Sequence, residues 1–96
     1  MKIQVTQTDI DKANKARRKS FSVRNSQHVF DPKFQCPIAQ AIKRMHGKDT
    51  YAEVMEDCIY FNNGSTIRTS KRMKQFIKKY DSFQKVTPKT FILTGI

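Results

Sequence analysis

The sequence predicts a small α+β domain in which an antiparallel sheet packs against two helices. Three observations predict this class: two apolar repeats of helical period, several short strand-like segments, and a length of 96 residues, which suits a single domain. The hydrophobic fraction of 38% is enough for one thin core. We therefore expect residues 1–96 to form one domain with the order β-α-β-β-β-α-β.

The amino-terminal segment predicts a strand and then a short helical turn. Ile3 and Val5 alternate with polar residues over 2–6, which is the period of a half-buried strand. Thr8 and Asp11 have the spacing of a capping box. We expect a single helical turn to begin there.

Residues 12–35 predict a basic, irregular arm. Seven Lys or Arg residues between positions 12 and 34 face one acid, and the apolar residues among them show no sustained period. Irregular connections of this length are uncommon in compact domains and are usually functional or disordered. The aromatic residues in or beside the arm suit either stacking on unpaired bases or packing of the arm on the core: Phe21, Phe30 and Phe34.

The clearest helical pattern covers residues 37–46. Pro37 is suited to the first turn of a helix, and Gly47 is suited to a left-handed cap after the last turn. The apolar stripe has the spacing i, i+3, i+4, i+7 and consists of Ile38, Ala41, Ile42 and Met45.

Three short strands are expected next, over 51–55, 57–62 and 65–68. Asn63-Gly64 can form a two-residue type I′ turn between the last two. That register places Tyr60 opposite Ile67, on the face that packs against the helices.

A second helix and a last strand complete the fold. Ser70 is a suitable N-cap, and Pro88 ends any helical continuation before a strand over 90–93. The apolar stripe of this helix is Met73, Phe76, Ile77, Tyr80 and Phe83, and Lys and Arg cover its other faces.

Three segments resemble small, uncharacterised proteins encoded by bacteriophages and prophages. They are the opening VTQTDID at 5–11, the helix start CPIAQAIKR at 36–44, and the closing pattern of Phe76-Ile77, Tyr80-Asp81, Val86, Pro88 and Thr90-Phe91. The resemblance covers 2–11 and 36–93 and implies a compact α+β unit of phage origin, without an activity. This sequence departs from the pattern at 12–35, where similar proteins are shorter and less basic.

The net charge of +11 belongs to two places. Residues 12–34 carry +6 and residues 68–79 carry another +6, so the rest of the chain is close to neutral. Such clusters either bind phosphates by releasing counterions or form solvated helix faces. We expect a small phage accessory protein that binds DNA or RNA, or a nucleoprotein surface. The expected phosphate contacts are Arg17, Arg18, Lys19, Arg24, Arg68, Lys71, Arg72, Lys74, Lys78 and Lys79.

Other kinds of chemistry are poorly supported. The spacing of Cys36, Cys58, His28 and His46 matches no zinc motif, and we expect no metal and no cofactor. Both cysteines are expected to be buried thiols, with Cys36 capping a helix. The acids near residue 56 suit a solvated turn better than an active site, so we expect a protein that is not an enzyme.

Two alternative functions remain open. The first is a protein inhibitor that docks on an acidic groove of a host or defence enzyme, in the manner of anti-CRISPR proteins. The second is a structural or assembly component of a virion. The sequence has no apolar run of membrane-spanning length and no secretory leader at its start, so we expect an intracellular protein in the host cytoplasm.

Overall fold

The computed structural model of this chain describes residues 1–22, 31–47 and 49–93. Its elements, in order, are β1 (Lys2–Val5), α1 (Gln7–Ser22), α2 (Pro32–Gln35), α3 (Pro37–His46), β2 (Ala52–Val54), β3 (Cys58–Phe61), β4 (Thr66–Arg68), α4 (Lys71–Asp81) and β5 (Lys89–Ile92). All strand pairs are antiparallel, and helices and strands share one core. The predicted α+β class is confirmed.

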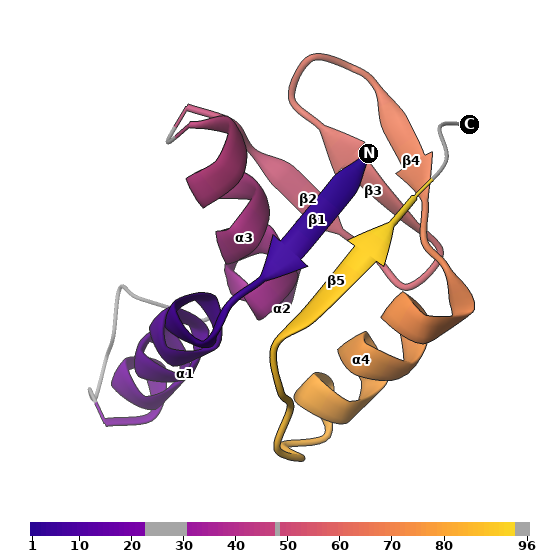
Figure 1. Cartoon of the computed structure of the whole chain (residues 1–96). Coiled ribbons are helices and arrows are strands. Elements are labelled where there is room, and N and C mark those ends of the chain that lie inside the picture. The colour runs from indigo at the N-terminus through magenta and orange to yellow at the C-terminus, as the bar shows by residue number, and fades with distance from the viewer. Residues whose placement is uncertain (23–30, 48, 94–96) are drawn as a thin grey trace.

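The described strands form two sheets, so the prediction of one antiparallel sheet is wrong. The first and last strands pair as β1-β5, with Ile3 opposite Phe91, and the other three form the meander β2-β3-β4. Figure 1 shows the β1-β5 pair crossing the centre of the molecule, with α1 and α4 below it. The short central pair joins the two ends of the chain, and the amino group of Met1 donates to the carbonyl of Leu93 at 2.7 Å.

The predicted irregular arm is the main error of the sequence analysis. Residues 12–22 belong to α1, and residues 32–35 form the short helix α2, while 23–30 lie outside the described residues. The helix begins two residues earlier than expected because Thr6, not Thr8, forms the capping box. The Asp9 carboxylate accepts from the Thr6 amide at 2.9 Å, and the Asp9 amide donates to the Thr6 hydroxyl at 3.3 Å.

The buried face of α1 is narrow, which explains why its period was missed. Ile10 and Ala13 are buried, but Asp9 is buried beside them and the half-buried Arg17 continues the same face. A helix whose inner face includes two charged residues does not show the apolar repeat that identifies an amphipathic helix.

The other two long helices supply much of the core, as expected. In α3, Ile38, Ala41 and Ile42 are buried, whereas Met45 at its end is exposed. Gly47 caps α3 with a positive φ of 102°, but its ψ of 152° differs from that of the predicted left-handed cap. In α4 the Ser70 hydroxyl accepts from the Met73 amide at 3.2 Å, and the buried stripe is Met73, Phe76, Ile77 and Tyr80.

The β3-β4 hairpin has a register one residue away from the predicted one. The Gly64 amide donates to the Phe61 carbonyl, and the Phe61 amide donates to Ser65, so three residues rather than two form the loop. Ile59 therefore lies opposite Ile67, and Tyr60 lies opposite Thr66. Since a shift of one residue turns every side chain to the other face, Ile59 is buried and Tyr60 is 48% exposed.

Candidate functional site

A groove lies between α4 and the segment that leads from α4 into β5. It has a volume of about 610 Å³ and is lined by Arg72, Gln75, Phe76, Lys78, Lys79, Lys85, Val86, Thr87 and Lys89. Of these nine described residues, five are Lys or Arg and none is acidic. We call it the cationic groove.

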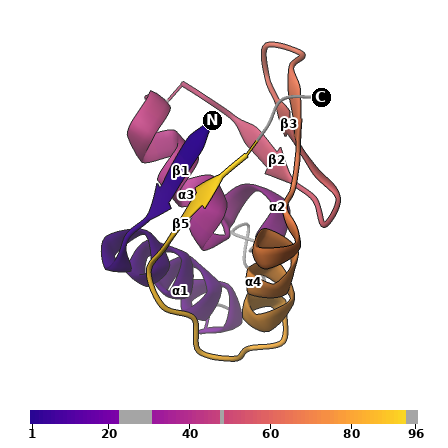
Figure 2. The ribbon, with the colours of Figure 1, turned by 45° about the vertical axis from the view of Figure 1, so that its right-hand side comes forward.

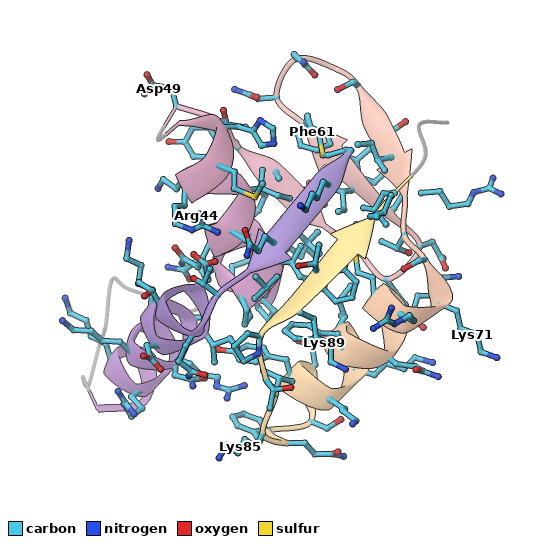
Figure 3. The ribbon with its side chains drawn as sticks, viewed as in Figure 1. Arg44, Asp49, Phe61, Lys71, Lys85 and Lys89 are labelled. Atoms are coloured by element: carbon cyan, nitrogen blue, oxygen red, sulfur yellow. The ribbon has the colours of Figure 1, made fainter. Side chains whose placement is uncertain are left out.

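The regular geometry of α4 places its cations along the groove. Arg72 and Lys79 are separated by two helical turns, so they point from the same face, and the buried Phe76 lies between them. The chain then returns past this face: Lys85 and Lys89 are exposed on the returning segment, and Val86 is buried. Figure 3 shows Lys89 beside α4 and Lys85 at the outer end of the same segment.

The neighbouring face of α4 meets acids instead. Lys74 Nζ lies 3.4 Å from Asp57 and Lys78 Nζ lies 3.2 Å from Glu56, on the connection between β2 and β3. Both pairs are partly or largely exposed, so each contributes about 1 kcal/mol or less to stability. These pairs neutralise Lys74 and also Lys78, which is itself part of the groove lining. Arg72 and Lys79 are therefore the helix cations of the groove that form no ion pair with a described acid.

A second depression lies between α1 and the segment after α4. It has a volume of about 310 Å³, and we call it the α1 pocket; its lining is Gln7, Ile10, Asn14, Arg17, Arg18, Tyr80, Phe83, Gln84, Lys85 and Val86. None of these described residues is acidic. In Figure 2 the segment between α4 and β5 passes along the lower ends of both helices. Because Lys85 and Val86 line both depressions, the cations of α1 and α4 meet in one continuous surface.

Arg17 has a structural part in this surface. Its Nη1 donates to the Tyr80 carbonyl at 2.8 Å, and its guanidinium carbon lies 4.1 Å from the centroid of the Tyr80 ring and 4.5 Å from that of Phe83. It thus joins α1 to the end of α4 through a hydrogen bond and two cation–π contacts. Arg18, the next residue, is exposed and lines the same pocket.

The other predicted phosphate contacts are more dispersed. Lys19 is exposed in the last turn of α1, Arg68 is exposed at the end of β4, and Arg24 lies outside the described residues. Lys71 is exposed in the first turn of α4 and points outward from the molecule (Figure 3). The described structure therefore brings together Arg17, Arg18, Arg72, Lys78 and Lys79, but not Lys19, Arg68, Lys71 or Lys74.

Lys85 and Lys89 are the two cations of the groove that were not predicted as phosphate contacts. They lie after the helix, in a segment without a periodic pattern. The sequence does contain one indication of their position, because only a short stretch of chain joins the end of α4 to the last strand. A short connection has to return beside the helix that it leaves.

A third depression, with a volume of about 250 Å³, has acidic residues in its lining: Asp31, Glu56 and Asp81. Burial raises the pKa of Asp81, and Glu56 adds to the increase, although Arg17 opposes it. Lys33 and Lys78 also line this cavity, so charges of both signs meet there. Phe76 and Lys78 line both this mixed cavity and the cationic groove, so the two depressions adjoin at α4.

The two cysteines differ in burial. Cys36 is buried and caps α3, with its sulfur accepting from the Ala39 amide at 3.5 Å, and burial raises the pKa of its thiol to about 12. The predicted buried, capping thiol is confirmed at this position, whereas Cys58 is half-buried in β3; both are free. Within the described ranges, no group of three or more His, Cys, Asp or Glu residues could hold a metal ion.

Comparison with protein-family models, curated proteins and solved structures finds no match to this chain. The resemblance to phage-encoded proteins therefore stays a prediction. None of the helices in the described part of the chain combines the length and the apolar character needed to cross a membrane.

Proposed function

We propose that this protein is a non-enzymatic nucleic-acid-binding protein whose cationic groove and α1 pocket contact phosphates. The observation that carries the proposal is the composition of the groove: its described lining has five cations, of which only Lys78 pairs with a described acid, and no carboxylate. The α1 pocket extends this lining through Lys85 to Arg17 and Arg18, again without a described acid. A row of cations shared by two adjoining depressions suits a chain of phosphates better than a single anion.

The physical basis of binding is the release of counterions. Each phosphate neutralised by Lys or Arg frees condensed cations, so affinity is high at low salt and falls steeply as salt increases. Arg72 and Arg18 can in addition pair with two phosphate oxygens at once, which Lys cannot do. These contacts read the backbone and not the bases, so we expect little sequence preference.

The direct test is fluorescence anisotropy of labelled oligonucleotides at about 50 mM salt, where electrostatic binding is strong. The charge-reversal variant R72E/K79E should bind far more weakly than the wild type. The matched control is K2E/K43E, which makes the same change in net charge at two exposed positions on β1 and α3, away from the groove. Equal losses in both variants, or no binding by the wild type, would overturn the proposal.

An acidic protein is the other partner that could occupy such a groove, and the experiment has to separate the two. Pull-down with the wild type from lysate treated with nuclease achieves this. Loss of all captured material after nuclease treatment supports binding to nucleic acid. Retention of a stoichiometric acidic protein that R72E/K79E fails to capture would replace the proposal with a protein-docking function.

A further inference from the structure

The residue after α4 has a backbone conformation that is unusual for its type. The Phe83 amide donates to the Tyr80 carbonyl at 3.1 Å, and the Gln84 amide donates to the Lys79 carbonyl at 2.9 Å, which together form a Schellman cap. Phe83 occupies its left-handed position with φ 62°, and it is the one non-glycine residue with positive φ among those that the structure describes. Glycine or asparagine normally takes this position, because a bulky side chain there is strained.

The strain is combined with high exposure of the ring. Phe83 is 63% exposed, whereas Phe76 and Tyr80 on the same helix are 3% and 1% exposed. Most of the Phe83 surface is thus accessible to solvent, although the ring also contacts Arg17. The Arg17 guanidinium, 4.5 Å from the ring centroid, holds the ring against the rim of the α1 pocket.

The surroundings of this ring are those of a phosphate-binding surface. Arg17, Arg18 and Lys85 line the pocket together with Phe83, and no described carboxylate does so. Exposed aromatic rings next to cations are the usual device for holding unpaired bases, because the cations bind the backbone while a base stacks on the ring. A duplex offers no such face, since its bases are already stacked on their neighbours.

We propose that Phe83 is a stacking platform for an unpaired base, so that the preferred ligand of this surface is single-stranded nucleic acid. This inference rests on the proposed function and adds the class of ligand. Phe83 keeps a strained conformation in the position where glycine would be relaxed. Its ring contacts the Arg17 guanidinium and stacks on the incoming base.

Two substitutions separate stacking from a purely structural role. F83G removes the ring and relaxes the backbone, so the variant should fold. If Phe83 only packs between α1 and α4 and positions Arg17, F83G should change the affinity for single strand and duplex equally or not at all. F83W keeps an aromatic platform and introduces the sole tryptophan of a chain that has none, which makes its emission a specific reporter.

The experiment compares an oligothymidylate with a duplex of equal length at about 50 mM salt. The wild type should prefer the single strand, and F83G should lose about tenfold or more in affinity for it while its affinity for the duplex stays the same. The emission of F83W should be quenched on saturation with the single strand but not with the duplex. Unchanged single-strand affinity in F83G, an equal loss of affinity for both probes, or unchanged emission in F83W overturns the inference.

The outcomes also distinguish this inference from the proposed function. Equal binding of single strand and duplex by the wild type and by F83G refutes stacking and leaves the electrostatic surface in place. Absence of binding to either probe by the wild type refutes both.

Discussion

The guanidinium of Arg44 holds the buried carboxylate of Asp9. Arg44 Nε lies 3.0 Å and 3.3 Å from the two Asp9 oxygens, and Nη2 lies 3.1 Å from one of them. The same Nη2 donates to the Gln4 carbonyl at 2.7 Å. Since Gln4, Asp9 and Arg44 belong to β1, α1 and α3, one ion pair joins three elements and also completes the cap of α1.

Replacing this carboxylate should therefore cost stability. D9N keeps the size of the side chain but removes the charge that Arg44 and the Thr6 amide bind. Because the Arg44 side chain is partly exposed, we expect a loss of about 2 kcal/mol in the free energy of unfolding, below the cost of breaking a fully buried pair. Urea denaturation measures it, and a loss of about 0.5 kcal/mol or less would contradict the role assigned to the pair.

The same pair predicts how stability depends on pH. Burial tends to raise the pKa of Asp9, but the hydrogen bonds from Arg44 and Thr6 outweigh it, so the pKa of Asp9 in the folded protein is below its usual value. The unfolded chain then binds a proton at Asp9 more readily than the folded protein does. The stabilisation from the ionised Asp9 carboxylate is therefore complete above about pH 4 and is lost as pH falls through the folded-state pKa. The difference in stability between wild type and D9N should shrink over that range; a constant difference would contradict this.

Arg17 should matter for the fold as well as for the surface. R17A removes the hydrogen bond to the Tyr80 carbonyl and the contacts with two rings, so we expect a loss of about 1 to 3 kcal/mol in the free energy of unfolding. The control R18A removes the same charge one residue later and should change stability by about 0.5 kcal/mol or less. Similar losses in both variants would show that Arg17 has no special part in joining α1 to α4.

The two thiols should differ in reactivity. Cys36 is buried, and because its thiol has a pKa raised to about 12 it remains protonated at neutral pH, whereas Cys58 is half-buried. Since the thiolate is the reactive form, iodoacetamide should modify Cys58 first in the native protein and Cys36 only after unfolding. Peptide mass spectrometry measures the order; labelling of Cys36 as fast as Cys58 would be inconsistent with the capping geometry.

Local patterns were sufficient for some elements and not for others. The stripes of α3 and α4 are visible in the sequence because their buried positions are apolar and regularly spaced. The inner face of α1 includes Asp9 and Arg17, whose partners Arg44 and Tyr80 are distant in the chain, so no local pattern shows that they are inside. The hairpin register depended on whether two or three residues form the loop, a choice that the Asn63-Gly64 pair alone does not decide.

The candidate site was predicted in part, for a similar reason. The helical pattern of α4 was enough to predict its cations as phosphate contacts. The pattern alone did not show that the faces of the helix differ in their surroundings. Tertiary structure divides them, because Glu56 and Asp57 approach one face while Lys85 and Lys89 approach the other. A charge count along the chain cannot distinguish a neutralised face from an unopposed one.

The salt dependence of binding tests the central claim most directly. In a titration of a single-stranded oligonucleotide, R72Q/K79Q removes two proposed phosphate contacts and should reduce the slope of log K against log salt by about 1.4. K2Q/K43Q makes the same change in net charge elsewhere and should keep the wild-type slope. A wild-type slope in R72Q/K79Q, or an equal reduction in K2Q/K43Q, would contradict the assignment of phosphate binding to the cationic groove.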